Sequence, residues 1–138
     1  MIALTRRYRF SAAHVLRSER FSDAENERIY GQCAHPSGHG HDYGLEITVT
    51  GPIDPASGAI VPVAELDRLV RERVLARLDH RLLNQEPWFR DAVPTAENIL
   101  LAVRRELEDA LAGRGGARLA RIRLTETRRN AFECGDEP

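Results

Sequence analysis

The chain has 138 residues, 42% of them hydrophobic and 30% charged, and a formal net charge of −1. This composition suits one globular domain over residues 1–138 and gives no reason to expect nucleic acid or an anionic membrane as a partner. No segment approaches the roughly 18 apolar residues of a membrane span, and the first residues lack a signal-peptide core. We therefore expect a cytoplasmic protein that does not bind membranes.

Two stretches in the first half alternate between apolar and polar residues, which predicts strands at residues 3–14 and 39–50. The apolar face of the first strand ends in a histidine and consists of Tyr8, Phe10, Ala12 and His14. The apolar face of the second begins with two histidines and consists of His39, His41, Tyr43, Leu45, Ile47 and Val49. Residues 22–30, between these strands, are polar and predict a loop or a short helix.

Helical spacing follows in the second half of the chain. Apolar residues three and four positions apart predict a helix over residues 63–78, with the stripe Val63, Leu66, Val70, Val74 and Leu78. A second helix is predicted over residues 95–112, with Thr95 as its N-cap and Gly113 as its stop.

Further strand signals flank these helices. Residues 59–61 are strand-like, residues 117–126 predict a third strand, and residues 131–134 can add a few strand residues. One face of the third strand consists of Ala120, Ile122, Leu124 and Glu126. The order predicts an α+β fold in which two helices cover one face of an antiparallel sheet.

Three histidines continue the apolar faces of these strands. His39 and His41 lie two residues apart and therefore share a face, and His14 ends the other strand. A His₃ set binds zinc and leaves the fourth tetrahedral position open, which is the catalytic arrangement. The alternative is that the His-x-His pattern is incidental and the rings are only hydrogen-bonded, but a buried imidazole without a partner is costly, which favours a shared metal.

Cys33 lies six residues before His39, and its spacing allows two roles. It could be a fourth zinc ligand in a closed structural site, or a free thiolate whose pKa is lowered by nearby positive charge. With two cysteines, we expect Cys33 and Cys134 to be unpaired thiols, and Cys134 has no predicted role.

Three acidic positions and one further histidine complete the candidates. Asp79 precedes His80, and a carboxylate orients a histidine in many proton-transfer sites, although His80 could simply favour a helix C-terminus. Glu97 suits the first turn of the second helix. Glu126 extends an apolar strand face, where a carboxylate needs a two-donor partner such as an arginine or the amidine edge of a pterin or guanine.

Five segments together resemble the 6-pyruvoyltetrahydropterin synthase family, which includes the 6-carboxytetrahydropterin synthases of queuosine biosynthesis. The segment from Cys33 to Tyr43, with its HGH motif, is the most specific of them. The others are Phe10-Ser-Ala-Ala-His14, Leu78-Asp-His80, Pro94-Thr-Ala-Glu-Asn98 and Leu124-Thr-Glu126. Pro62 departs from the family pattern, in which an acidic or amide residue is usual.

The resemblance implies a role for each candidate. His14, His39 and His41 would bind zinc. Cys33 would be the catalytic proton-transfer residue, with Asp79 and His80 completing the relay. Glu126 would anchor the pterin ring, and Thr95 and Glu97 would line its pocket.

The resemblance also implies the tunnelling fold, in which a four-stranded antiparallel sheet carries two helices and the subunits join their sheets into a barrel. A trimer-based homo-oligomer, such as a hexamer, would then have active sites between subunits. The implied activity is that of a zinc-dependent lyase, which acts on 7,8-dihydroneopterin triphosphate and eliminates triphosphate. The product could be 6-pyruvoyltetrahydropterin or 6-carboxytetrahydropterin. The rival hypothesis is a non-catalytic, zinc-stabilised binding module with Cys33 as fourth ligand.

Overall fold

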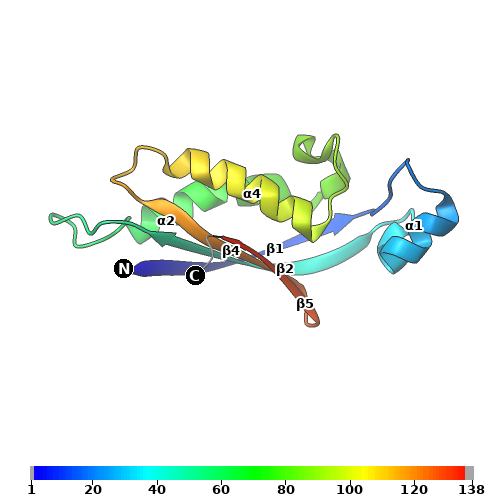
Figure 1. Cartoon of the computed structure of the whole chain (residues 1–138), viewed down its shortest axis with the longest axis horizontal. Coiled ribbons are helices and arrows are strands. Elements are labelled where there is room, and N and C mark those ends of the chain that lie inside the picture. The colour runs from blue at the N-terminus through cyan, green and yellow to red at the C-terminus, as the bar shows by residue number, and fades with distance from the viewer. Residues whose placement is uncertain (1, 136–138) are drawn as a thin grey trace.

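The computed structural model describes residues 2–135, in which one sheet carries the helices on one of its faces (Figure 1). The strands are β1 (Ala3–His14), β2 (His39–Thr50), β3 (Arg81–Leu82), β4 (Arg118–Thr127) and β5 (Asn130–Gly135). Their order is β3-β1-β2-β4-β5, and all neighbours are antiparallel except β3, which pairs parallel with β1. The predicted α+β class is confirmed. The sheet has five strands where four were expected, because β3 is only two residues long and leaves no alternation to detect.

The hairpin of β1 and β2 carries the candidate histidine ligands at its connected end, where β1 ends and β2 begins. Its register runs without a break from the pair Ala3↔Thr50 to the pair His14↔His39. The alternation that the sequence predicts is present, because Phe10 and Tyr43 are buried and stack on each other with ring centroids 4.7 Å apart. A long regular ladder therefore brings the two ends of the predicted histidine faces together.

The connection between β1 and β2 folds into helix α1 (Asp23–Tyr30) and the 3₁₀ turn η1 (Gly31–Ala34), which lie beyond the end of the sheet (Figure 1). Ser22 and Glu25 form a capping box at the start of α1, which fixes where this helix begins. The backbone N–H of Leu16 donates to the carbonyl of Cys33 over 2.6 Å. That bond fixes the backbone of η1 against the end of β1.

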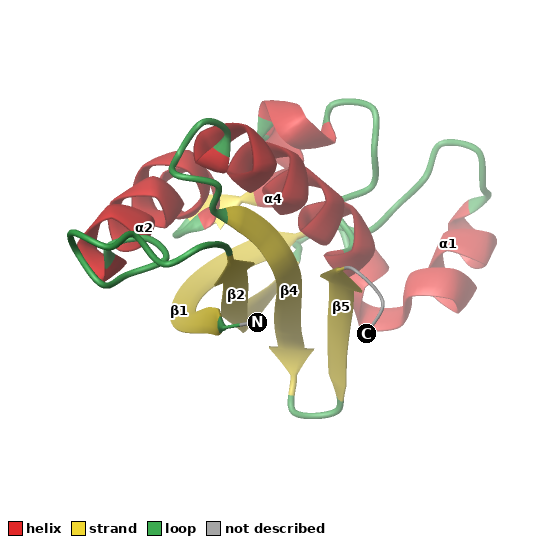
Figure 2. Ribbon diagram, turned by 60° about the vertical axis from the view of Figure 1, so that its left-hand side comes forward, coloured by secondary structure: helices red, strands yellow, loops and turns green. Residues whose placement is uncertain are grey.

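The helices of the second half of the chain cover one face of the sheet (Figure 2), and Leu66, Val70, Val74 and Leu78 of the predicted stripe are buried. Helix α2 (Val63–Val70) continues through a π-helical turn at Arg71–Leu75 into α3 (Ala76–Leu78), and α4 (Ala96–Leu111) begins at the N-cap Thr95. Short 3₁₀ turns lie at Leu83–Gln85 and Pro87–Phe89. Two details were wrong: residues 59–61 form bends instead of a strand, and Val63, in the first turn of α2, is 41% exposed. None of the helices in residues 2–135 combines the length and apolar character of a membrane span.

Strand β4 departs from simple alternation at two points. Leu119 pairs with Val49 and Arg121 pairs with Thr48, so Ala120 is an extra residue in β4. This bulge shifts the pattern by one position, and Leu119 packs against the core where Ala120 was expected. A second register shift, between Thr125 and Thr127, places Glu126 in a bulge.

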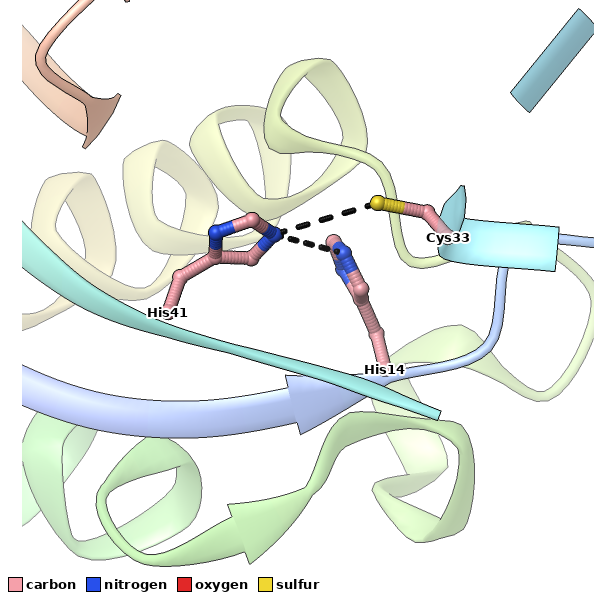
Figure 3. A group of neighbouring side chains, drawn as sticks. All are labelled: His14, Cys33 and His41. Atoms are coloured by element: carbon pink, nitrogen blue, oxygen red, sulfur yellow. Dashed lines mark hydrogen bonds between the residues drawn. The ribbon is translucent and has the colours of Figure 1, made fainter. Parts of the chain in front are cut away.

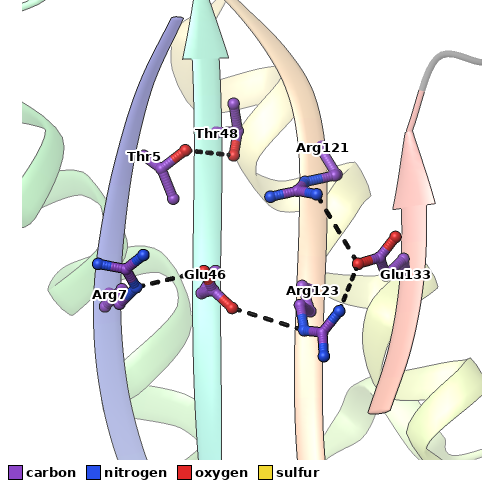
Figure 4. A network of polar contacts seen from close by, with 7 residues as sticks. All are labelled: Thr5, Arg7, Glu46, Thr48, Arg121, Arg123 and Glu133. Carbon is purple, nitrogen blue, oxygen red and sulfur yellow. Dashed lines mark hydrogen bonds and ion pairs between the residues drawn. The ribbon is translucent and has the colours of Figure 1, made fainter. Parts of the chain in front are cut away.

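The opposite face of the sheet is polar (Figure 4). The Thr5 and Thr48 hydroxyls are 2.8 Å apart. Glu46 and Glu133 alternate with arginines across the strands in four ion pairs, Arg7–Glu46, Arg123–Glu46, Arg123–Glu133 and Arg121–Glu133. Charged pairs such as these suit a face that borders water or polar surfaces, so the apolar core lies between the sheet and the helices only.

Candidate metal centre and active site

His14 is the anchor of the site. It is the last residue of β1 and is 0% exposed. Its Nδ1 lies 3.0 Å from the carbonyl oxygen of Pro94, which can only accept, so Nδ1 carries the proton. The lone pair is then on Nε2, on the other side of the ring, and such a bond to the second ring nitrogen is how proteins orient a metal-binding histidine. A backbone carbonyl leaves no side-chain signal, so this partner was missed in the sequence.

His41 and Cys33 converge on that Nε2 (Figure 3). The Nε2 atoms of His41 and His14 are 3.2 Å apart, and the Sγ of Cys33 is 3.9 Å from the Nε2 of His41. The three donor atoms all lie within 4.8 Å of one another. A tetrahedral zinc ion places two nitrogen ligands about 3.3 Å apart and a nitrogen and a sulfur ligand about 3.6 Å apart. The donor types and their spacing therefore fit zinc.

His39 lies beside this group. It is half-buried, pairs with His14 across the hairpin, and its ring centroid is 4.7 Å from that of His41. The structure thus brings two of the three predicted histidine ligands together with Cys33 and places the third one ring away. That His39 completes the ligand set remains a prediction.

Burial controls the titration of the three gathered side chains. Burial is the largest of the effects that lower the pKa of His14 and of His41. A lowered pKa favours the neutral imidazole, which is the form that binds metals. Burial, followed by the negative charge of Glu126, raises the pKa of the Cys33 thiol. The described residues therefore disfavour the thiolate, and the alternative in which Cys33 has a lowered pKa requires a positive charge that residues 2–135 do not supply.

Glu126 lies close enough to the cluster to influence the pKa of His14, His41 and Cys33. The bulge at the end of β4 carries it, and its Oε1 accepts a hydrogen bond from the Nδ2 of Asn130 over 3.2 Å. Bulges beside active sites commonly serve to re-aim one side chain. Within residues 2–135 Glu126 forms no ion pair with an arginine, so most of its accepting capacity is left for another partner.

Asp79 and His80 follow α3 and are hydrogen-bonded to the backbone of Ser11 in β1, three residues before His14. The Oδ1 of Asp79 accepts from the backbone N–H of Ser11 over 3.0 Å and lies 2.9 Å from the Nδ1 of His80. The N–H of His80 donates to the Ser11 carbonyl over 2.6 Å, with His80 at φ 59°, a left-handed conformation uncommon outside glycine. The carboxylate thus lies within hydrogen-bond distance of the imidazole, but no hydrogen bond in the described part of the chain joins the pair to Cys33.

His80 instead borders a hollow of about 430 Å³. Ser11 and Asp42 line it as well, and the Ser11 hydroxyl donates to Asp42 over 2.5 Å. The backbone of Ser11 was not identified from the sequence as a support for the dyad, because its role depends on which loop returns to the edge of β1.

The two residues predicted to line a pterin pocket, Thr95 and Glu97, both lie at the start of α4. The Thr95 hydroxyl accepts from the backbone N–H of Asn98 as the N-cap of α4, and Glu97 is exposed in the first turn. Because Pro94 binds His14, this helix start borders the cluster, but a contact of Thr95 or Glu97 with substrate remains a prediction. Cys33 and Cys134 are unpaired thiols, as predicted.

The fold and the site define an α+β protein with a histidine and cysteine group that could hold a metal ion at one end of a mainly antiparallel sheet. Residues 3–137 match the family described as 6-pyruvoyl tetrahydropterin synthase. The chain belongs to this family, and it is an enzyme of the carbon–oxygen lyase type.

Individual relatives agree with the family match. A 6-pyruvoyl tetrahydrobiopterin synthase of Poecilia reticulata is 39% identical over 92% of this chain and 85% of its own. The Homo sapiens protein of the same name is 40% identical over 78% of this chain and 75% of its own. The structure of Caenorhabditis elegans 6-pyruvoyl tetrahydropterin synthase superposes with a TM-score of 0.88 at 33% identity, covering 99% of this chain and 96% of that one.

Proposed function

We propose that this lyase uses zinc, held by His14, His39 and His41, to convert 7,8-dihydroneopterin triphosphate into a 6-substituted tetrahydropterin with loss of triphosphate. The observation that carries the proposal is the convergence of the His14 and His41 Nε2 atoms at 3.2 Å, with the Cys33 sulfur beside them. The names of the relatives support a pterin substrate and favour 6-pyruvoyltetrahydropterin as the product.

Each protein group has a distinct task in this reaction. Bound zinc would act as a Lewis acid on the substrate's side-chain oxygens and acidify the neighbouring C–H bond. Cys33 removes that proton, and His80, oriented by Asp79, returns a proton to the substrate. Glu126 binds the N–H and amino group of the pterin ring through two parallel hydrogen bonds. The oxidation and reduction are internal to the substrate, so nicotinamide and flavin are not required.

The separation of His80 from Cys33 supports a site shared between subunits. A relay needs hydrogen-bond contact, directly or through one water, and within residues 2–135 of one chain no hydrogen bond joins His80 to Cys33. We therefore propose a trimer-based homo-oligomer in which Asp79 and His80 of one copy face Cys33 of the next.

Mixed oligomers test this arrangement. Cys33→Ala and His80→Ala should each be inactive alone. Denatured together in equal amounts and refolded, they should recover about a quarter of wild-type activity, because one in four random neighbour pairs carries both intact residues. If the mixture stays inactive while wild-type protein refolds with full activity, the shared site is wrong.

The reaction itself is tested by mass spectrometry of the products formed from 7,8-dihydroneopterin triphosphate, with acetaldehyde assayed in parallel. A 6-pyruvoyl product without acetaldehyde supports 6-pyruvoyltetrahydropterin as the product of this enzyme. A 6-carboxy product with stoichiometric acetaldehyde assigns the chain to the other branch of the family, that of queuosine biosynthesis. Turnover to neither product would refute the proposed reaction.

The rival function, a zinc-stabilised binding module, is favoured by one observation: the Cys33 sulfur lies 3.9 Å from the Nε2 of His41, close to ligand spacing. A cysteine that closes a structural site resists alkylation of the zinc-loaded protein by iodoacetamide at all times. A catalytic cysteine should be alkylated during turnover, when substrate binds at the metal, with activity lost in the same proportion.

A further inference from the structure

The position of Cys33 suggests that this residue has two roles in turn: the zinc ligand of the rival binding module and the catalytic base of the proposed lyase. The sulfur is anchored from the backbone, because the Cys33 carbonyl accepts from Leu16 two residues beyond His14. The next residues turn tightly into β2 through bonds from His35 to Gln32 and from Gly38 to His35. The cysteine backbone is therefore fixed beside the two histidines, and the sulfur can enter or leave the cluster by rotation about a single side-chain bond.

The donor atoms are arranged as a ligand set more than as a hydrogen-bonded cluster. The Pro94 carbonyl holds the proton of His14 on Nδ1, so the His14 Nε2 presents only a lone pair. His41 directs its own Nε2 at that lone pair from 3.2 Å and at the Cys33 sulfur from 3.9 Å. A single proton on His41 can serve only one of these neighbours well, whereas one cation between them satisfies all three donors.

We propose that the Cys33 sulfur occupies the fourth coordination position of the zinc in the substrate-free enzyme and gives it up when substrate binds. This inference rests on the proposed function. The exchange is balanced: the sulfur leaves with its electron pair as a thiolate, a side-chain oxygen of the substrate donates a lone pair in its place, and nothing is oxidised or reduced. The released thiolate then lies beside the C–H bond that it must deprotonate.

This exchange resolves a conflict at the site. Three histidines leave one position open, yet the only soft donor in the cluster lies close enough to fill it. If Cys33 closed the site permanently, substrate could not reach the metal. If it never approached the metal, the half-buried sulfur would have no cation to hold it as the anion that catalysis needs. An exchangeable ligand provides both conditions in sequence.

Cobalt substitution tests the proposal without measuring turnover. Co²⁺ bound by a thiolate has an intense charge-transfer absorption in the near ultraviolet, whereas Co²⁺ bound by nitrogen and oxygen has only weak visible bands. We expect the intense band in the wild-type protein loaded with Co²⁺ and in the matched control Cys134→Ser. Cys33→Ser should bind Co²⁺ with the band reduced to background, and Cys33→Ala provides a second variant if the serine protein is poorly folded.

Saturation with 7,8-dihydroneopterin, which keeps the side-chain hydroxyls but lacks the triphosphate, tests the exchange. The band of the wild-type protein should fall to background while Co²⁺ stays bound, as measured by metal analysis. Bound Co²⁺ without the band in the wild-type protein overturns the ligation. A band that persists at saturation overturns the exchange and supports the closed site. Failure to bind Co²⁺ or Zn²⁺ at all refutes the metal enzyme itself, a separate outcome.

Discussion

Replacement of Glu126 by glutamine tests how the enzyme binds its substrate. The carboxylate is half-buried near His14 and Cys33, and its one described protein partner is the Asn130 amide, 3.2 Å from Oε1. A carboxylate accepts from the pterin N–H and amino group together, while an amide can accept only one of these bonds. The substitution therefore removes one hydrogen bond to a charged group and presents an N–H₂ where an acceptor is needed.

The expected loss is about 1.5–3 kcal/mol, the usual value for a hydrogen bond to a charged group. This corresponds to a pterin Kd weaker by about tenfold to 150-fold. Folding should change little, because the side-chain oxygen of glutamine can still accept from Asn130. Zinc content should also be kept, since the proposed ligands lie on β1 and β2.

Titration of the Glu126→Gln protein with 7,8-dihydroneopterin, by calorimetry or by quenching of pterin fluorescence, measures the effect. Glu133→Gln is the matched control, because Glu133 lies on β5 and pairs with Arg121 and Arg123 on the polar face of the sheet. Its pterin affinity should equal that of the wild type. Unchanged affinity in Glu126→Gln, together with a smaller oligomer on size-exclusion chromatography, would show that Glu126 pairs with an arginine of another copy instead.

Three other variants have distinct expected outcomes. His39→Ala should reduce bound zinc from about one ion per chain to a small fraction of that by metal analysis, and full retention would remove His39 from the ligand set. Cys33→Ala should keep fold and zinc while kcat falls by about 10²–10⁴-fold, and loss of the metal would favour the structural site. Hydrogen bonds from Arg6 and Tyr8 lower the pKa of Asp67, so its contribution to stability is present above the unfolded value of 3.8 and is lost as pH falls through the lower folded pKa. Asp67→Asn should therefore lower Tm by a few degrees at pH 7 and lessen the acid sensitivity of Tm, and an unchanged pH profile would contradict this linkage.

The regular parts of the fold were predictable because burial is periodic there. The unbroken β1–β2 register gives every second residue the same surroundings, so the alternation up to His14 predicted both the strand and the buried histidine. The pattern failed where the backbone is irregular. The bulge at Ala120 moves Leu119 into the core, and no sequence period indicates an extra residue in one strand.

The sequence predicted those members of the site that act through their side chains, but not those that act through their main-chain groups. His14, His41 and Cys33 were identified by residue type and spacing, and the structure places them together. The Pro94 carbonyl and the Ser11 backbone, which orient His14 and the Asp79–His80 pair, belong to main-chain groups that every sequence contains. Their importance follows from long-range packing, since residue 94 reaches residue 14 only after the helices have returned to the sheet.

Strand β1 explains why one chain can hold both parts of the proposed catalytic apparatus and still not join them. His14 faces the core under the helices, whereas Ser11, three residues earlier and of opposite parity, directs its side chain to the other face and holds the dyad through its backbone. A stiff strand fixes the two groups relative to each other, and no hydrogen bond among residues 2–135 joins the dyad to Cys33. In the ring of identical subunits that we propose, every copy repeats this fixed offset, so that facing the dyad of one copy toward Cys33 of the next needs no flexible segment. The rigidity that separates the groups within one chain is therefore what would align them between chains.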